Sequence, residues 1–380
     1  MGKHDTERAD TPIGRPKSGY IPQLDGLRAL AVLVVILSHA GIPFIRGGKS
    51  GVLVFFALSG FLITTILARE LTRTGSVDFR KFYIRRVLRL APALVTVVAF
   101  VSVIALLLPS APESKASLEA IPSVLLYYNN WIQLAFGGDA MGWYPHFWSL
   151  AVEEQFYLVW PFIMFLAFKW KGLPAVAWTG LIGAVLSVLD KLFLWHGESG
   201  RQAGTDFAAD GLLLGCSLAA LMVIGSPRLA RACKALFWPA VAALLAAAVL
   251  GNSSGSASTA QYELFGKLFW PLAVVSSVVI INTLVTGTAP RFVMAVLAWK
   301  PMVHIGRISY GMYLWHIIIL AGLKSDWNPS RSVPVITLEL LVLTVIVASL
   351  SFKYIEQPFL KRKDKFETVN PGADRAVVPA

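Results

Sequence analysis

The sequence predicts an all-α, polytopic transmembrane helical bundle of about ten spans, with both termini in the cytoplasm. Of its 380 residues, 56% are hydrophobic and only 15% are charged, and the mean hydropathy is +0.64. This composition is typical of a chain that is solvated by lipid. Apolar runs that could span a bilayer lie near residues 23–42, 51–68, 86–108, 147–168, 173–194, 207–224, 235–251, 268–287, 308–323 and 333–355.

Basic residues predict the orientation of the bundle. They are concentrated in every second connection, and the opposite connections hold few of them. The connection before the third span and the segment after the last span are the richest, with Arg69, Arg73, Arg80, Lys81, Arg85 and Arg86 in the first and Lys361, Arg362, Lys363 and Lys365 in the second. The positive-inside rule therefore puts both termini in the cytoplasm of a multi-pass protein of the cell membrane. The net charge of +12 then needs no nucleic-acid partner, because no soluble domain remains to bind one.

The chain divides into a membrane domain and two polar tails. Residues 1–20 contain no apolar signal-peptide core and are expected to be a disordered cytoplasmic tail, as are residues 363–380. Residues 21–362 form the membrane domain, in which the stretch 109–145 is expected to hold an outer lid or a short interfacial helix. The two cysteines form no disulfide or metal pattern, so we expect no metal.

The first span carries polar residues, which are costly inside a bilayer and therefore indicate a specific role. Arg28 and His39 are eleven residues apart, which is about three helical turns, so their side chains share one face about 16 Å apart along the axis. Asp25 lies three residues before Arg28 and is close enough to pair with it. The alternative is that Arg28 extends to the interface and that His39 is an ordinary interfacial histidine.

Later spans carry further polar groups. Three arginines open the third span, where they either direct topology or bind phosphate groups, for which arginine is well suited. Glu153 and Glu154 are adjacent, and neighbours on a helix diverge by about 100°, so we expect only one of them, Glu153, to face the interior. It could orient His39, pair with an arginine or bind an acceptor.

Six motifs occur in order along the chain. They read DGLRALAVLVVILSH at 25–39, GVLVFFALSGFLIT at 51–64, FYIRRVLRLAP at 82–92, FWSLAVEEQFYLVWP at 147–161, IGRISYGMYLWH at 305–316 and YIEQPF at 354–359. Together they resemble the acyltransferase 3 family of integral membrane O-acyltransferases over residues 20–362, in its stand-alone form without a fused SGNH domain.

The resemblance implies an enzyme that moves an acetyl or other short acyl group from cytoplasmic acyl-CoA to a hydroxyl. The acceptor is expected to be a cell-surface glycan or its precursor, such as lipopolysaccharide or peptidoglycan. The alternative acceptor is a macrolide or another natural product, and a secondary transporter is a further alternative. Acyl-CoA is then the donor substrate, the bilayer and the acceptor are the other partners, and the oligomeric state is left open.

The resemblance also implies roles for individual residues. His39 is expected to act in catalysis, either as the base that takes the proton of the acceptor hydroxyl or as a residue that is itself transiently acylated. The full catalytic set is His39, Arg28, Asp25 and Glu153. The residues expected to bind the donor are Arg85, Arg86, Arg89, Ser59, Gly60 and Phe61. Those expected to bind the acceptor are His146, Trp148 and His316.

Four of these assignments have structural alternatives. Ser59 and Gly60 could serve close helix packing instead of passage of the pantetheine arm. His316 could be a buried structural hydrogen-bonding group, and Trp148 could belong to the aromatic belt of the membrane. Glu356 is expected to pair with a nearby base such as Arg307.

Overall fold

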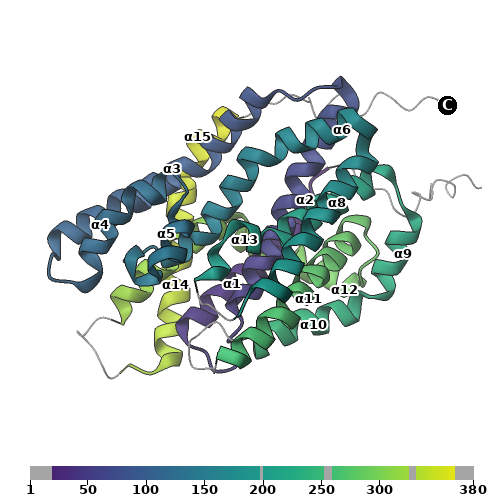
Figure 1. Cartoon of the computed structure of the whole chain (residues 1–380). Coiled ribbons are helices and arrows are strands. Elements are labelled where there is room, and N and C mark those ends of the chain that lie inside the picture. Colours follow the sequence, from purple (N-terminus) through teal and green to yellow (C-terminus); the bar gives the residue numbers. More distant parts are fainter. Residues whose placement is uncertain (1–18, 197–199, 252–258, 325–330, 364–380) are drawn as a thin grey trace, which may run out of the picture.

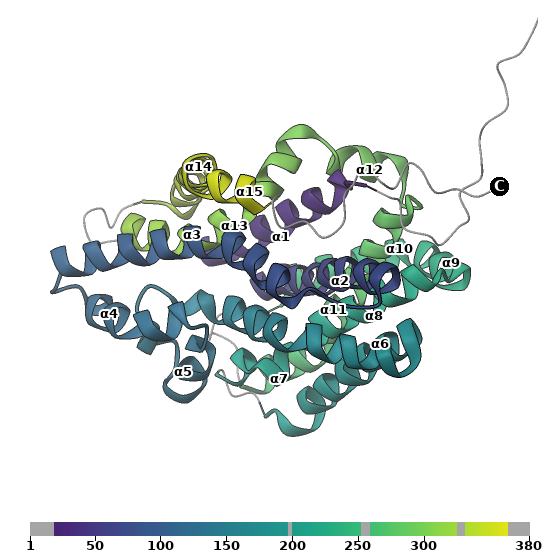
Figure 2. The ribbon, with the colours of Figure 1, turned by 90° about the horizontal axis from the view of Figure 1, so that it is seen from above.

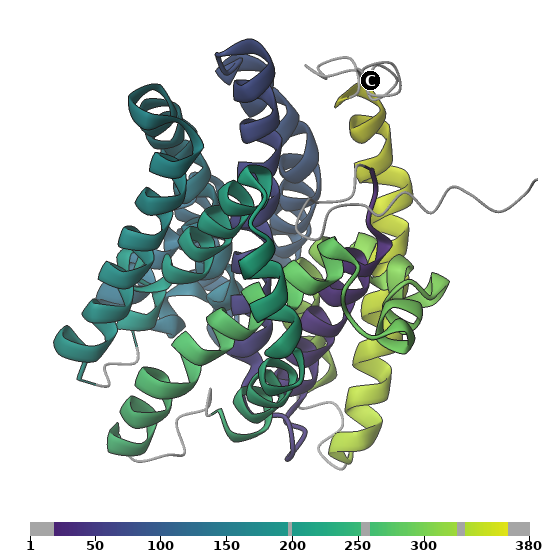
Figure 3. The same cartoon turned by 90° about the vertical axis from the view of Figure 1, so that its right-hand side faces the viewer.

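The computed structural model describes residues 19–196, 200–251, 259–324 and 331–363, and within them every regular element is a helix. All ten of the predicted apolar runs lie on helices, which confirms the fold class. Most of the two terminal tails, residues 1–18 and 364–380, lies outside the described residues. Figure 1 shows the helices in chain order, and Figure 3 shows α14 running along one side of the bundle.

The long helices begin with α1 (Pro22–Ala40), α2 (Gly48–Thr74) and α3 (Phe79–Leu107). The first two end at glycines in the left-handed conformation, Gly41 with φ 89° and Gly75 with φ 68°. A glycine in this conformation ends a helix, because its own amide can donate a hydrogen bond to one of the last carbonyls of the helix. The remaining longer helices are α6 (Trp148–Leu189), α8 (Asp210–Ile224), α10 (Phe237–Leu250), α11 (Thr259–Thr286), α13 (Lys300–Leu323) and α14 (Val333–Ser351).

The ten spans that we predicted are not confirmed. By length and apolarity, six of the described helices can cross a membrane, or seven if the bent pair α9 (Pro227–Ala235) and α10 is one span. The segment Pro145–Leu194 counts once, although the backbone of α6 leaves helical geometry at Lys171 and Gly172, where we placed a connection. Helix α8 has only 15 residues and α13 is not among the six, so the count of ten is not confirmed. The chain is a multi-pass membrane protein.

Short helices fill the connections. The stretch 109–145 holds α4 (Pro112–Leu125), α5 (Asn129–Phe136) and the 3-10 turn η1 (Gly138–Met141), and a second turn, η2 (Pro145–Phe147), leads into α6. A short helix was expected there. The other short elements are η3 (Asp190–Leu194), η4 (Arg201–Ala203), α7 (Thr205–Ala208), α12 (Arg291–Leu297), η5 (Phe352–Glu356) and α15 (Gln357–Lys363).

Two close helix contacts position the site. A Cβ atom on Gly306 of α13 would overlap the backbone carbonyl of Asp25 in α1, and one on Gly60 of α2 would overlap that of Leu212 in α8. Small residues allow helix backbones to approach in this way within a membrane. Seen from above, α1 and α13 lie on one side of α2, and α8 and α6 lie on the other (Figure 2).

Candidate active site

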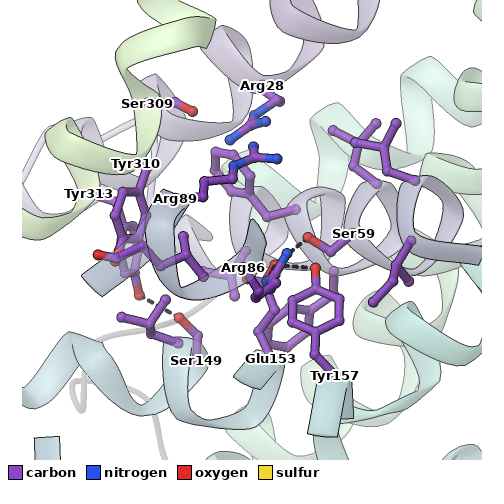
Figure 4. Close-up of a pocket in the computed structure, with 18 of the residues that line it drawn as sticks. Arg28, Ser59, Arg86, Arg89, Ser149, Glu153, Tyr157, Ser309, Tyr310 and Tyr313 are labelled. Atoms are coloured by element: carbon purple, nitrogen blue, oxygen red, sulfur yellow. Dashed lines mark hydrogen bonds and ion pairs between the residues drawn. The ribbon is translucent and has the colours of Figure 1, made fainter. Parts of the chain in front are cut away.

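A cavity with both polar and apolar lining lies between α1, α2, α3, α6 and α13 and is partly open to the exterior. Its charged and hydroxyl-bearing lining comes from all five helices, whereas the rest of the wall is apolar (Figure 4). The polar lining residues are Arg28, Ser59, Arg85, Arg86, Arg89, Ser149, Glu153, Tyr157, Ser309, Tyr310 and Tyr313. Of the residues that we predicted for catalysis or donor binding, the cavity therefore collects Arg28, Ser59, Glu153 and the three predicted arginines of α3, Arg85, Arg86 and Arg89.

Glu153 is held by three donors on the cavity wall. Its Oε1 atom accepts hydrogen bonds from Ser59 Oγ at 2.5 Å and from the Tyr157 hydroxyl at 2.5 Å. The same atom lies 3.4 Å from Nη2 of Arg86 (Figure 4). A carboxylate with these neighbours is fixed in place. None of them is His39, so of the roles considered for Glu153 the structure favours pairing with an arginine.

Arg86 is neutralised by the protein itself. Its guanidinium lies 2.7 Å from Glu154 Oε1 as well as 3.4 Å from Glu153, and it packs 3.2 Å from the ring centre of Tyr157. Of the two glutamates, only Glu153 lines the cavity, as we predicted, although Glu154 also reaches Arg86. The two glutamate side chains leave the helix in different directions, but the Arg86 guanidinium lies within reach of both. Arg86 is therefore engaged by carboxylates and is a poor candidate for holding a donor phosphate.

Arg28 and Arg89 differ from Arg86 in this respect. Within the described residues neither has a carboxylate oxygen within 4.0 Å, and Arg28 Nε is buried without a hydrogen-bond partner. In Figure 4 their guanidinium groups lie beside each other at one end of the cavity, near Ser309, whose buried Oγ also lacks a partner. Two adjacent guanidinium groups repel each other and offer many hydrogen-bond donors. This end of the cavity is suited to an anion with several oxygens, such as a phosphate.

Two predicted ion pairs were wrong. Asp25 pairs with Arg307 of α13, at 3.8 Å, and accepts a hydrogen bond from the Tyr20 hydroxyl, which leaves Arg28 free to face the cavity. The i,i+3 spacing allowed an Asp25–Arg28 pair, but α13 crosses α1 at this level and brings a competing cation. Glu356 accordingly does not pair with Arg307; it is buried in η5 and accepts a hydrogen bond from Ser351 Oγ at 3.4 Å.

Gly60 and Phe61 do not line the cavity, although both were expected to bind the donor. Gly60 lies against the Leu212 carbonyl, so the packing alternative describes it correctly. Phe61 is buried in an apolar cluster with Leu218 and Ile281. Of the three consecutive residues in α2, only Ser59 reaches the cavity. The spacing of residues on a helix gives each of the three a different direction, and the sequence did not show which one faces α6.

The three histidines of the predicted site form a separate cluster. His39 Nδ1 lies 3.3 Å from His316 Nε2, and the His146 and His316 rings lie 4.9 Å apart. His39 is exposed, whereas His146 and His316 are 4% and 0% exposed. The sequence placed His146 and His316 at the acceptor, and the structure instead brings them behind His39. Trp148 lies apart from them, packing against Phe56 and 5.3 Å from Lys49 Nζ.

Tyr313 connects the cavity and the histidine cluster. It lines the cavity, and its ring lies 5.4 Å from His146 and 5.5 Å from His316. Its hydroxyl donates a hydrogen bond to the His146 carbonyl at 2.5 Å and accepts one from Ser149 Oγ at 2.7 Å. The sequence analysis missed the roles of Tyr313, Tyr157 and Ser309. Tyr157 follows Glu153 by four residues and Tyr313 follows Ser309 by four, a spacing that marks neighbours on one helix face.

Known proteins are similar to this chain over most of its length. The acyltransferase domain family matches residues 21–353. The peptidoglycan O-acetyltransferase OatA of Listeria monocytogenes is 33% identical over 90% of this chain and 56% of its own length. The O-acetyltransferase OatA of Staphylococcus aureus is 28% identical over 90% of this chain and 58% of its own length. A putative O-acetyltransferase of Staphylococcus aureus is 30% identical over 93% of this chain and 59% of its own length.

The chain thus spans less than three fifths of the length of these relatives. No solved structure matches it. The family match covers the helices that form the arginine-lined cavity and the histidine cluster. Five of the six sequence motifs fall within it, and the sixth, YIEQPF, begins just beyond its end. The chain belongs to the acyltransferase 3 family of membrane O-acyltransferases.

Proposed function

We propose that this protein transfers an acetyl or other short acyl group from acyl-CoA, entering from the cytoplasm, to a hydroxyl of a cell-surface glycan. The observation that carries the proposal is the pair of guanidinium groups, Arg28 and Arg89, that face the cavity with no carboxylate oxygen of the described residues within 4.0 Å. CoA brings several phosphate groups, and arginine binds phosphate oxygens with paired, charge-assisted hydrogen bonds. Ser309 Oγ offers a further donor at the same end.

The rest of the cavity suits the remainder of the donor. Its wall is largely apolar beyond the arginines, with Phe55, Phe56, Leu62 and Ile63 among the lining residues. An apolar channel inside a bundle excludes water, which would otherwise hydrolyse the thioester. The acyl end of the donor would then lie toward Ser149 and Tyr313, beside the histidine cluster.

His39 supplies the base in this proposal. Its ring is the exposed member of the cluster, so an acceptor hydroxyl can approach it from outside the bundle. The hydroxyl oxygen attacks the thioester carbonyl while its proton moves to His39. The carbon–sulfur bond then breaks, and the thiolate of CoA takes the proton from His39. The products are the O-acyl ester and free CoA.

The acceptor class comes from the relatives. One of them is named as a peptidoglycan O-acetyltransferase and the others as O-acetyltransferases. We therefore place a cell-wall glycan first among acceptors, and the cell membrane as the site of action. Because this chain is shorter than those relatives, its acceptor requires a direct test.

The test is release of free thiol from acetyl-CoA by the purified protein in detergent or nanodiscs. Acceptors would include peptidoglycan fragments, lipopolysaccharide and a macrolide. Wild type is expected to release thiol only with an acceptor, and His39→Ala is expected to lose turnover while still binding acetyl-CoA. Acceptor-dependent release that persists in His39→Ala would reject His39 as the base. Failure of the wild type to bind CoA would reject the donor.

Donor binding is tested by calorimetry with CoA on Arg28→Ala and Arg89→Ala. Each loses hydrogen bonds to a charged ligand, which are worth about 1.5–3 kcal/mol, so Kd is expected to rise about 10- to 100-fold. Arg80→Ala is the matched control, because Arg80 is an exposed arginine on the same helix as Arg89 and does not line the cavity. Equal changes in all three variants would point to general charge attraction instead of a specific site.

A further inference from the structure

The hydrogen bonds of the histidine cluster fix where its protons lie. His316 Nδ1 lies 2.7 Å from the backbone carbonyl of Tyr313, and a carbonyl only accepts, so Nδ1 of His316 carries the proton. A neutral imidazole has one N–H group, which leaves Nε2 of His316 as an acceptor. The burial of His316, with 0% exposed, favours the neutral ring.

The same reasoning extends to His39. His316 Nε2 lies 3.3 Å from His39 Nδ1, and since it accepts, His39 Nδ1 must be the donor. The Val35 carbonyl, 3.0 Å from the same His39 nitrogen, agrees with this assignment. The lone pair of neutral His39 is therefore on Nε2, the nitrogen that makes no hydrogen bond within the cluster. This is the atom that can take a proton from an incoming hydroxyl.

The two acceptors around His39 Nδ1 act differently. Val35 belongs to α1, so its bond moves together with His39 and does not tie the ring to the rest of the bundle. His316 belongs to α13 and is itself anchored to the Tyr313 carbonyl. Only His316 therefore holds the His39 ring relative to Tyr313, which lines the donor cavity.

We propose that His316 is a positioning residue that accepts the Nδ1–H of His39, keeps Nε2 as the basic atom and orients the ring toward the acceptor. This inference rests on the proposed function, in which His39 is the base. When Nε2 of His39 takes the hydroxyl proton, the ring becomes an imidazolium whose Nδ1–H still bonds to His316. A neutral imidazole here holds the role that a carboxylate has in a Ser-His-Asp triad.

His146 supports this arrangement without joining the chain of hydrogen bonds. Its Nε2 lies 3.3 Å from the Leu314 carbonyl, so it carries the proton, and its ring packs edge-on against His316. Neither nitrogen of His316 is left for His146, because one bonds to Tyr313 and the other to His39. His146 therefore limits the movement of the His316 ring.

The direct experiment is nitrogen NMR on protein labelled with 15N-histidine in nanodiscs, which distinguishes the two imidazole tautomers. Loss of a signal in His39→Ala identifies His39 among the six histidines. Wild type is expected to show the Nδ1–H tautomer of His39. His316→Leu removes one of the two acceptors and leaves the Val35 carbonyl, so the preference for this tautomer is expected to weaken without being lost. His316→Gln places an amide oxygen near the position of Nε2 and is expected to retain the wild-type signal.

Turnover gives the second measurement. His316→Leu is expected to lower kcat about 10- to 100-fold with the Kd for CoA within about two-fold, and His316→Gln is expected to recover most of the loss. His304→Gln is the matched control, since His304 is an exposed histidine on the same helix that contacts Ser349. The His39 signals and the turnover of His304→Gln should match those of wild type.

Two outcomes would overturn the inference. One is an unchanged His39 tautomer in His316→Leu, and the other is an equal loss of kcat in the Leu and Gln variants. If His316→Leu fails to fold, loss of the His39 Nδ1–H signal in the folded His316→Gln protein would likewise overturn the inference. The tautomer is measured without any acyl transfer, so an inactive wild type would reject the proposed function while the positioning role is still tested.

Discussion

Arg28 and His39 lie eleven residues apart on one face of α1, yet they belong to two different sites. Arg28 lines the arginine cavity with Arg89, and His39 joins His316 in the histidine cluster. Tyr313 of α13 contacts both sites. One helix thus links a region suited to anions with a region suited to proton transfer.

Arg86→Ala is expected to destabilise the protein far more than Arg89→Ala. Without Arg86, the partly buried Glu153 and Glu154 lose their cation, and breaking such a pair costs about 3–5 kcal/mol. In the part of the chain that the structure describes, Arg89 has no carboxylate oxygen within 4.0 Å, and it lies near Arg28, so its removal relieves repulsion between like charges. Thermal unfolding in detergent without ligand measures both variants. Equal losses of thermal stability would mean that Arg86 and Arg89 have equivalent roles.

Gly306→Ala is expected to lower stability and donor binding together. The added methyl group would overlap the Asp25 carbonyl and force α1 away from α13, which moves Arg28 and Ser309 apart. Gly322→Ala is the control on the same helix, because its Cβ would meet nothing within 4 Å. Alanine is favoured over glycine in a helix by up to about 1 kcal/mol, so Gly322→Ala should be neutral or stabilising. A harmless Gly306→Ala would show that the two helices can separate freely.

Tyr313→Phe is expected to slow acyl transfer while leaving CoA affinity within about two-fold. The change removes the hydroxyl that bonds to the His146 carbonyl and to Ser149, so the groups between the cavity and the histidines lose their alignment. Misplacement by about 1 Å can cost a factor of about 100 in rate, and we expect a loss of at least about ten-fold. Tyr83→Phe removes a comparable hydrogen bond, to the Leu158 carbonyl, away from the cavity. Similar kcat values for the two variants would contradict a role for Tyr313 in transfer.

Lys191→Met is expected to destabilise the bundle, and a second change, Asp210→Leu, is expected to restore much of the loss. Lys191 and Asp210 are 2.5 Å apart, and each side chain is only 1% exposed. Removing one partner leaves a buried charge unpaired, at a cost of about 3–5 kcal/mol, whereas an apolar pair of similar size is often tolerated. Comparing the unfolding midpoints of the two single variants and the double variant measures the coupling. Additive losses would show that the pair does not interact.

The helical architecture could be predicted because lipid imposes it. Each apolar run must satisfy its own backbone hydrogen bonds, and all ten runs are helices. The number of spans was harder to predict. The break at Lys171 and Gly172 follows from local backbone geometry, and α8 is only 15 residues long. Hydropathy finds apolar segments and does not show which of them cross the bilayer.

The sequence could predict which residues belong to the site, but not which of them contact one another. The sequence identified Arg28, His39, Arg89 and Glu153, and their arrangement depends on how different helices meet. Asp25 pairs with Arg307, 282 positions away, because α13 crosses α1 at a glycine contact. Arg86 reaches both glutamates because α3 and α6 approach each other at that level. Local spacing alone could not show either relationship.

Tyr313 also makes the histidine cluster sensitive to what fills the cavity. Its ring lines the cavity and contacts His146 and His316, and its hydroxyl bonds to the His146 carbonyl and to Ser149. A ligand that displaces this ring would therefore move the histidines that pack against it. Under the proposed function, a donor in the cavity would alter the surroundings of the base before the acceptor arrives.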